Sequence, residues 1–140
     1  MRKHGGMIIA AVLILLLACA FALRDNFVRL YVRLNSGALE EFALASLEDC
    51  RKDPLSARYG PWNTTAWKRA EAVEFYVQQS FAFGGVEKGF YYSKNDAPIS
   101  FNAVDTPLVE AEIGWRWEAY GNHGTTYRIL PCWFWYEAVL

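Results

Sequence analysis

The stretch AVEFYVQQ, residues 72–79, alternates between two kinds of side chain with a period of two. Val73, Phe75 and Val77 would face one side of a β-strand, and the residues between them, which carry polar groups, would face the other. Upstream of Gly60 the apolar spacing is instead close to 3.6 residues, which is typical of helices. The stretch therefore belongs to a sheet-forming part of the chain that follows a helical part.

The same period of two predicts further strands on both sides of this stretch. The candidates are Pro61–Arg69 before it, and Lys88–Ser93, Glu112–Tyr120 and Thr125–Leu140 after it. Turn-forming residues separate them at Gly84-Gly85, at Lys94–Pro98 and at Gly121–Gly124. Pro131 marks a bulge or an edge within the last candidate.

The helical part of the chain lies before residue 54. An apolar stripe at i, i+3, i+4 and i+7, formed by Phe27, Leu30, Tyr31 and Leu34, predicts an amphipathic helix. Asn35–Gly37 interrupts it or caps a second helix over 38–49. Helices first and strands after favour an α+β domain, in which the helix 38–49 lies across an antiparallel sheet of four to six strands.

Residues 7–23, MIIAAVLILLLACAFAL, carry no charge and follow Arg2 and Lys3. As a helix they would span roughly 25 Å, the short end of what a bilayer core requires. An uncleaved signal anchor, a cleaved secretory signal and a lipoprotein signal with Cys19 as the attachment point all fit. We favour the anchor, because no polar, helix-breaking stretch follows it.

The anchor implies a single-pass protein of the cell membrane with its C-terminal domain outside the cytoplasm; cleavage would instead give a secreted protein. It divides the chain into a signal anchor or signal peptide (1–23), a juxtamembrane helical region (24–53) and an antiparallel β domain (54–140) completed by helix 38–49. The formal net charge is −1, with +4 in residues 1–34 and −5 in the remainder. This pattern suits a membrane edge and argues against a nucleic-acid partner, which needs a clustered basic surface.

Few residues suggest catalysis. His4 lies in the leader and His123 in a glycine-flanked turn, so the folded part has one imidazole, too few for a zinc site or a histidine-based triad. Asn95-Asp96 and Asn122 offer too few oxygen ligands for calcium. We therefore expect no catalytic residue, no metal and no cofactor, and a protein that is not an enzyme.

Cys50 and Cys132 are the thiols beyond the leader. An oxidising compartment would permit them to form a disulfide, which would close a loop of about 80 residues and add ~4 kcal/mol to the stability. The alternative, which we favour, is two buried thiols that stay unpaired and behave as small apolar groups.

The aromatic residues offer the strongest functional hint. In the stretch CWFWY, residues 132–136, Trp133 and Trp135 would point to one side of a strand, and Trp115 and Trp117 are spaced in the same way. If the four tryptophans share a face, neighbouring strands would build a ladder larger than a thin helix cover would bury. Such a face would bind a protein or a glycan of the envelope.

Several segments resemble known sequences. GFYYS (89–93), GWRW (114–117), TYRILPCWFWYEA (126–138) and the leader followed by RDNFVRLYVRL (24–34) resemble a set of small single-span proteins from Firmicutes-type bacteria, which carry no assigned function. The resemblance implies a location in the bacterial envelope and transfers no active site.

These observations favour a membrane-anchored, extracytoplasmic interaction module that binds its partner through an aromatic sheet face. A small carbohydrate-acting enzyme of the envelope is the alternative, using two of the carboxylates on or near the strands: Glu74, Glu110, Glu112, Glu118 and Glu137. An accessory subunit of a membrane complex is a third interpretation.

Overall fold

The structure is a computed structural model and describes residues 3–49, 51–79, 84–103 and 105–140. The chain forms two compact units, Met1–Tyr31 and Val32–Leu140. One helix, α1 (Lys3–Glu48), begins in the first unit and ends in the second. Within it Asn35 departs from helical geometry, with φ −121° and ψ 17°. The expected interruption at Asn35–Gly37 is therefore a kink in a single helix.

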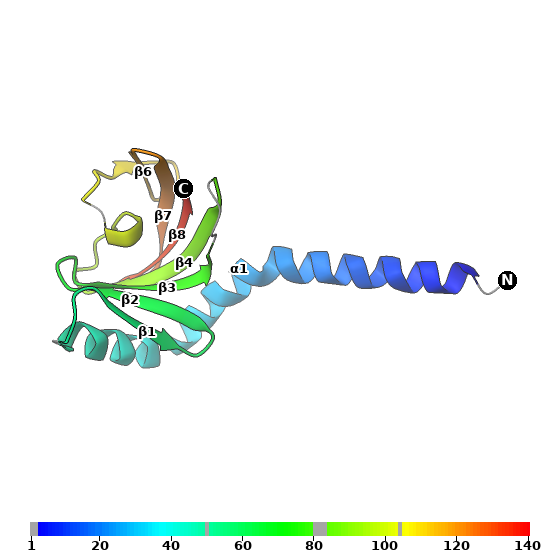
Figure 1. Ribbon diagram of the computed structural model, residues 1–140, viewed down its shortest axis with the longest axis horizontal. Helices are drawn as coiled ribbons and strands as arrows, with labels where there is room; N and C mark the ends of the chain where they lie inside the picture. Colours follow the sequence, from blue (N-terminus) through cyan, green and yellow to red (C-terminus); the bar gives the residue numbers. More distant parts are fainter. Residues whose placement is uncertain (1–2, 50, 80–83, 104) are drawn as a thin grey trace. The chain divides into compact units, whose positions relative to one another are not determined.

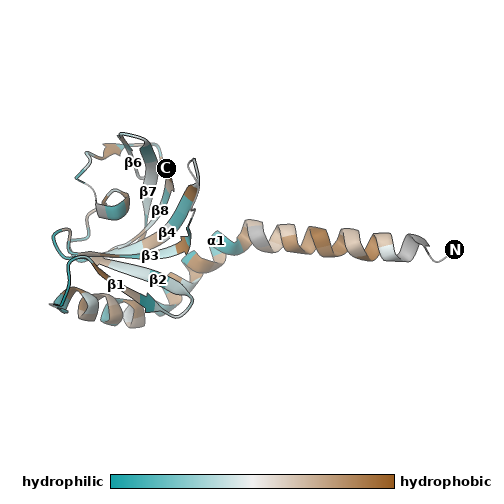
Figure 2. Cartoon of the chain, in the orientation of Figure 1, coloured by the Kyte–Doolittle hydropathy of each residue, from teal (hydrophilic) through white to brown (hydrophobic). Residues whose placement is uncertain are grey.

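The first unit consists of the apolar part of α1. Its described apolar side chains from Met7 to Leu23 are exposed. Figure 2 colours the middle of this helical stretch brown, which marks apolar residues. This helix is long and apolar enough to cross a membrane. A helix that is apolar all round, with none of these side chains buried by protein, fits the expected anchor.

The second unit contains an open antiparallel sheet of eight strands (Figure 1). The strands are β1 (Leu55–Tyr59), β2 (Trp62–Trp67), β3 (Ala72–Gln78), β4 (Val86–Ser93), β5 (Val109–Glu110), β6 (Trp115–Ala119), β7 (Asn122–Leu130) and β8 (Trp133–Val139). Their order in the sheet is β1-β2-β3-β4-β8-β7-β6-β5. Two four-stranded meanders thus join where β4 pairs with β8.

The α+β class is confirmed, but the expected four to six strands are too few. The strands β2, β3, β4 and β6 lie within the expected ranges or overlap them closely, whereas β1 and β5 are additional. The expected last strand, Thr125–Leu140, is wrong as a single element, because it is divided between β7 and β8.

Two tight turns explain the differences near the C-terminus. Leu130 pairs with Trp133, so Pro131 and Cys132 form a two-residue hairpin turn in which Cys132 has a φ of 64°. Ala119 pairs with Asn122, so Tyr120 and Gly121 form the preceding turn. Residues 122–124, expected in a turn, belong instead to β7.

The part of α1 that belongs to the second unit, residues 32–48, packs against one side of the sheet (Figure 1). Leu39 and Ala43 are fully buried there. The Phe42 ring lies 5.0 Å from the ring of Tyr59 and 5.9 Å from that of Phe75. The expected packing of helix 38–49 on the sheet is therefore confirmed, and we call this side of the sheet the helix side.

The opposite, concave side is covered by the crossover that links β4 to β5. This segment contains the short helix η1 (Phe101–Ala103), drawn in yellow in Figure 1. Phe101 packs 5.3 Å from the Tyr136 ring, and the Tyr91 hydroxyl accepts a hydrogen bond from the Ile99 N–H at 2.9 Å. The central strands are therefore buried on both sides.

Candidate binding surface

The four tryptophans do not share a face of the sheet. Trp135 pairs with Tyr127 and Phe90, whereas Trp115 pairs with Thr126, which pairs in turn with Tyr136. Because paired residues lie on one face and successive residues alternate, Trp133 and Trp135 lie on the helix side. Trp115 and Trp117 lie on the concave side, so no four-tryptophan ladder forms.

Burial separates the tryptophans further. Trp133 and Trp135 are fully buried, and Trp133 lies 5.9 Å from the Phe75 ring. Trp117 is buried in the concave core, whereas Trp115 is half-buried and contacts Phe134 edge-on at 6.2 Å. Three of these four tryptophans are therefore buried in the two cores that flank the sheet, and they are not available as an exposed aromatic face.

A groove of about 660 Å³ lies over the half of the sheet formed by β5 to β8. It is lined by Val109, Arg116, Trp117, Glu118, His123, Gly124, Thr125, Glu137 and Val139. Glu137 and Val139 continue the alternation of Trp133 and Trp135, which places the groove on the helix side. The lining side chains on this side form two rows of cross-strand partners. One row consists of Val109, Arg116, Thr125 and Glu137, and the neighbouring row consists of Glu118, His123 and Val139.

The groove mixes charges with apolar walls. Arg116 and Glu118 come from β6 and are exposed, and so is His123 on β7. Glu137 pairs with Lys88 at 3.4 Å and lies 3.4 Å from Trp135 Nε1, which donates to it. The core tryptophan thereby helps to orient a carboxylate at the groove. The surface is balanced in charge, which suits a polypeptide better than a polyanion.

Exposed apolar side chains lie at the groove and in the turns of the same half of the sheet. Val86, Val109, Ile113 and Tyr120 are the large apolar side chains that the structure describes as exposed outside α1. Val109 lines the groove, and Val86 pairs with the lining residue Val139. Ile113 and Tyr120 lie in the turns at the two ends of β6. Exposed apolar residues beside polar ones in the same half of a sheet are typical of an interaction surface.

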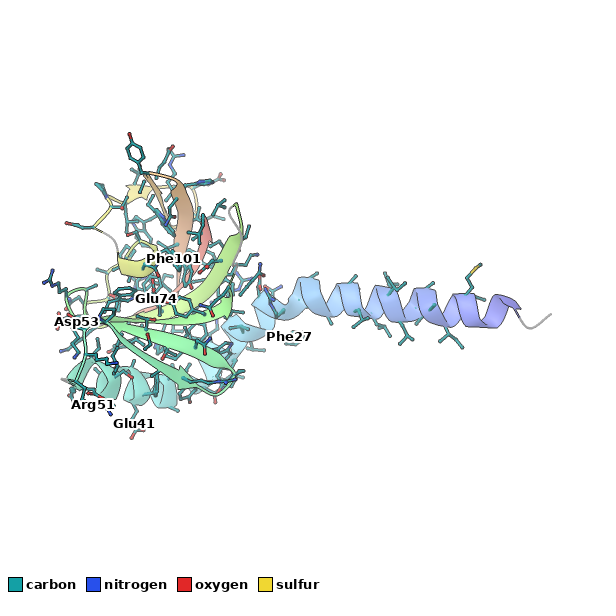
Figure 3. All side chains as sticks on the ribbon, in the orientation of Figure 1. Phe27, Glu41, Arg51, Asp53, Glu74 and Phe101 are labelled. Atoms are coloured by element: carbon teal, nitrogen blue, oxygen red, sulfur yellow. The ribbon has the colours of Figure 1, made fainter. Side chains whose placement is uncertain are left out.

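A second polar feature is buried in the concave core. Glu74 is fully buried, and its carboxylate accepts hydrogen bonds from Trp67 Nε1 at 2.8 Å, from the Tyr76 hydroxyl at 3.1 Å and from the Asn102 N–H at 2.7 Å. Figure 3 shows Glu74 and Phe101 on this side of the sheet. Burial raises the pKa of Glu74 to about 7, against the opposing effect of the three donors.

Glu74 connects the sheet to the crossover, because Asn102 belongs to η1. Neighbouring Tyr136 has no hydrogen-bond partner for its buried hydroxyl among the described residues. Burial and the nearby Glu74 charge raise the pKa of Tyr136 well above its ordinary value. Both phenol and carboxyl groups are thus held away from solvent, and we assign them to the core.

The remaining candidates stay apart from any organised site. Cys132 is half-buried in the β7–β8 turn, and its N–H donates to Asp96 at 2.6 Å. Cys50 lies outside the described residues, so the disulfide remains a prediction. Among the residues that the structure describes, no three His, Cys, Asp or Glu side chains lie together in a way that could hold a metal.

The sequence did not predict the groove itself. Its residues come from four strands, and their assembly depends on the two tight turns that the sequence patterns misplaced. No pattern in the sequence singled out the apolar lining residues Val109 and Val139. No protein-family model, curated protein or solved structure matches this chain.

Proposed function

We propose that this chain is a membrane-anchored binding module, in which the β5–β8 half of the sheet docks a segment of a partner protein. The observation that carries the proposal is that the groove, its exposed lining residue Val109 and the exposed turn residues Ile113 and Tyr120 all belong to this half of the sheet. Ile113 is 74% exposed and Val109 55% exposed, although both belong to the folded unit. Exposure of such apolar side chains to water is unfavourable in free energy, and burial against a partner removes that unfavourable contribution.

The tryptophans contribute less directly than an exposed aromatic face would. Trp117 is among the residues that line the groove, but its side chain is buried on the concave side, where half-buried Trp115 also lies. Trp133 and Trp135 lie on the same face of β8 as the lining residues Glu137 and Val139, and their burial fixes the position of this strand. The charged pairs at the groove would set the orientation of the partner, and the apolar residues would supply most of the affinity.

The anchor is the other half of the proposal. Residues 7–23 would hold the protein in the cell membrane, with the second unit outside the cytoplasm. The described apolar side chains of this segment are exposed, which supports insertion into lipid, whereas a secreted form would lose them by cleavage.

Site-specific cross-linking tests the docking surface. We would replace Ile113 with a photoreactive residue in the full-length chain, irradiate intact cells, and use the exposed Ser56 on β1 as a matched position. We expect one discrete protein adduct from Ile113 and none from Ser56. In a Val109→Asp background the adduct should disappear, because the charge would be buried by the partner. Equal labelling at both positions would contradict the proposal.

Carbohydrate hydrolysis remains a second candidate, because Glu118 and Glu137 line the same groove. One strand separates them in the register, which puts their Cα atoms roughly 12 Å apart. Two glutamate side chains can bring their carboxyl groups to the separations that glycosidases use. An enzyme would lose turnover of envelope polysaccharide on Glu118→Gln or Glu137→Gln, whereas a binding module would show no turnover to lose.

A further inference from the structure

The membrane-spanning segment predicted from composition is short. Residues 7–23 span roughly 25 Å as a helix, whereas a bilayer core of about 30 Å needs about 20 residues. The structure shows that α1 continues without a break beyond Leu23 and that Asn35 is the first described residue with non-helical angles. The residues that follow Leu23 therefore keep a regular helical face.

That face is apolar and exposed on one side. Leu23, Phe27 and Leu30 lie at i, i+4 and i+7, which places them one above another along the helix. They are 47%, 63% and 50% exposed. The stripe extends the apolar surface of the first unit by about 10 Å beyond Leu23.

The charges of the same segment lie elsewhere around the helix and are paired within it. Arg24 contacts Asp25 at 3.2 Å, and the Arg29 Nε donates to the Asp25 carbonyl oxygen at 3.2 Å. Arg29 also donates to the Asn26 side chain. Arginines that fold back on their own helix lower the cost of lying close to the hydrocarbon boundary.

We propose that residues 23–31 form an interfacial segment, in which Leu23, Phe27 and Leu30 contact the acyl chains of a phospholipid bilayer while Arg24 and Arg29 lie at the depth of the headgroups. This inference rests on the proposed anchor. Lipid is the occupant that fits, because the stripe continues the exposed apolar surface of residues 7–23 and supplies the length which that segment lacks. The aromatic rings of Phe27 and Tyr31 suit the membrane interface.

Photo-cross-linking to lipid tests the segment. The full-length chain would be reconstituted in vesicles of phosphatidylcholine and phosphatidylglycerol, with a photoreactive residue at Phe27 or Leu30. Leu13, inside the apolar stretch, is the positive control, and the exposed Ala45 on the last turns of α1 is the negative control. We expect the mass of the chain to increase by that of one phospholipid when the photoreactive residue is at Phe27, Leu30 or Leu13, and no such adduct when it is at Ala45.

The outcomes separate this inference from the anchor. A lipid adduct at Leu13 without one at Phe27 and Leu30 would overturn the interfacial segment and leave the anchor intact. No adduct at any of the three would overturn both. An adduct between two copies of the chain at Phe27 would show that a second copy covers the stripe, and would also overturn the inference, as would lipid labelling at Ala45 equal to that at Phe27.

Discussion

At the scale of single residues, burial is favourable for the apolar side chains on one face of β3 but requires hydrogen-bond partners for the carboxyl group on the other face. Phe75 stacks on Phe90 with ring centroids 4.6 Å apart, so its burial is favourable without further partners. Glu74, one residue earlier, must be matched by three hydrogen-bond donors from two strands and η1. Alternation in the sequence predicts the two directions correctly, but it does not predict that a carboxyl group is enclosed.

Glu74 makes stability depend on pH. Its pKa is raised from the ordinary value of 4.5 to about 7, so between these values the folded protein keeps a proton that the unfolded chain releases. The free energy of unfolding should therefore fall as the pH rises from 4.5 to 7, by about 3 kcal/mol, and level off above pH 7. Below pH 4.5 both states are protonated and the penalty vanishes.

Glu74→Gln should remove this dependence. All six tryptophans lie in the second unit, so their fluorescence reports its unfolding by denaturant in the full-length chain in detergent. We expect the difference in unfolding free energy between pH 5 and pH 8 to shrink in the variant. If the wild type and the variant show the same difference, the burial of an ionisable Glu74 is refuted.

Two tyrosines of the concave core should respond oppositely to loss of the hydroxyl. The Tyr136 hydroxyl has no described partner, so Tyr136→Phe should leave stability unchanged or raise it by up to about 1 kcal/mol. The Tyr91 hydroxyl bonds Thr126 Oγ1 at 2.8 Å and the Ile99 N–H, so Tyr91→Phe should cost about 1–2 kcal/mol. Denaturant unfolding would measure both; equal losses would argue against this hydrogen-bond assignment.

At the scale of elements, strands with a buried face were predictable and strands without one were not. β3 and β4 bury most of their residues and show clear periodicity, whereas the three central residues of β1 are all exposed. β5 has two residues and offers no pattern to detect. Hydrophobic periodicity reports burial on one side, so an exposed edge strand leaves no such signal.

The division of Thr125–Leu140 was missed because its turn uses an unusual residue. The second turn position needs a positive φ, which glycine or asparagine normally supplies, and here Cys132 adopts it. Asp96 from the crossover compensates by accepting the Cys132 N–H. Since the missed turn reverses the chain, the sequence could not show which tryptophans share a face or that a groove forms beside them.

The contact between α1 and the sheet should depend on Phe42. Its ring contacts Tyr59 and Phe75, and truncation would leave a gap between the two layers. Phe42→Ala should lower the free energy of unfolding by about 2–3 kcal/mol, less than for a fully buried phenylalanine.

Phe27→Ala is the matched control, because Phe27 is exposed on the same helix. It should leave the tryptophan-detected unfolding in detergent unchanged. A similar loss in both variants would mean that the helix stabilises the fold through general helical propensity and not through the Phe42 contact.

At the scale of the whole molecule, the apolar leader was the most predictable feature, since it depends on composition alone. The structure adds that its helix runs on into the second unit, where the last turns of α1 form one layer of the core. Signal cleavage near Ala22 would still leave residues 38–48 to cover the sheet. The proposed anchor would therefore determine where the protein is located and not how the second unit folds.

The most direct test of the central hypothesis is the location of the full-length chain in intact cells. After fractionation, the protein should sediment with membranes and resist extraction by high salt, and protease added outside the cytoplasmic membrane should degrade the second unit. Recovery of the intact polypeptide in the soluble cytosolic fraction, inaccessible to the added protease, would contradict the anchor and the docking surface assigned to the exterior.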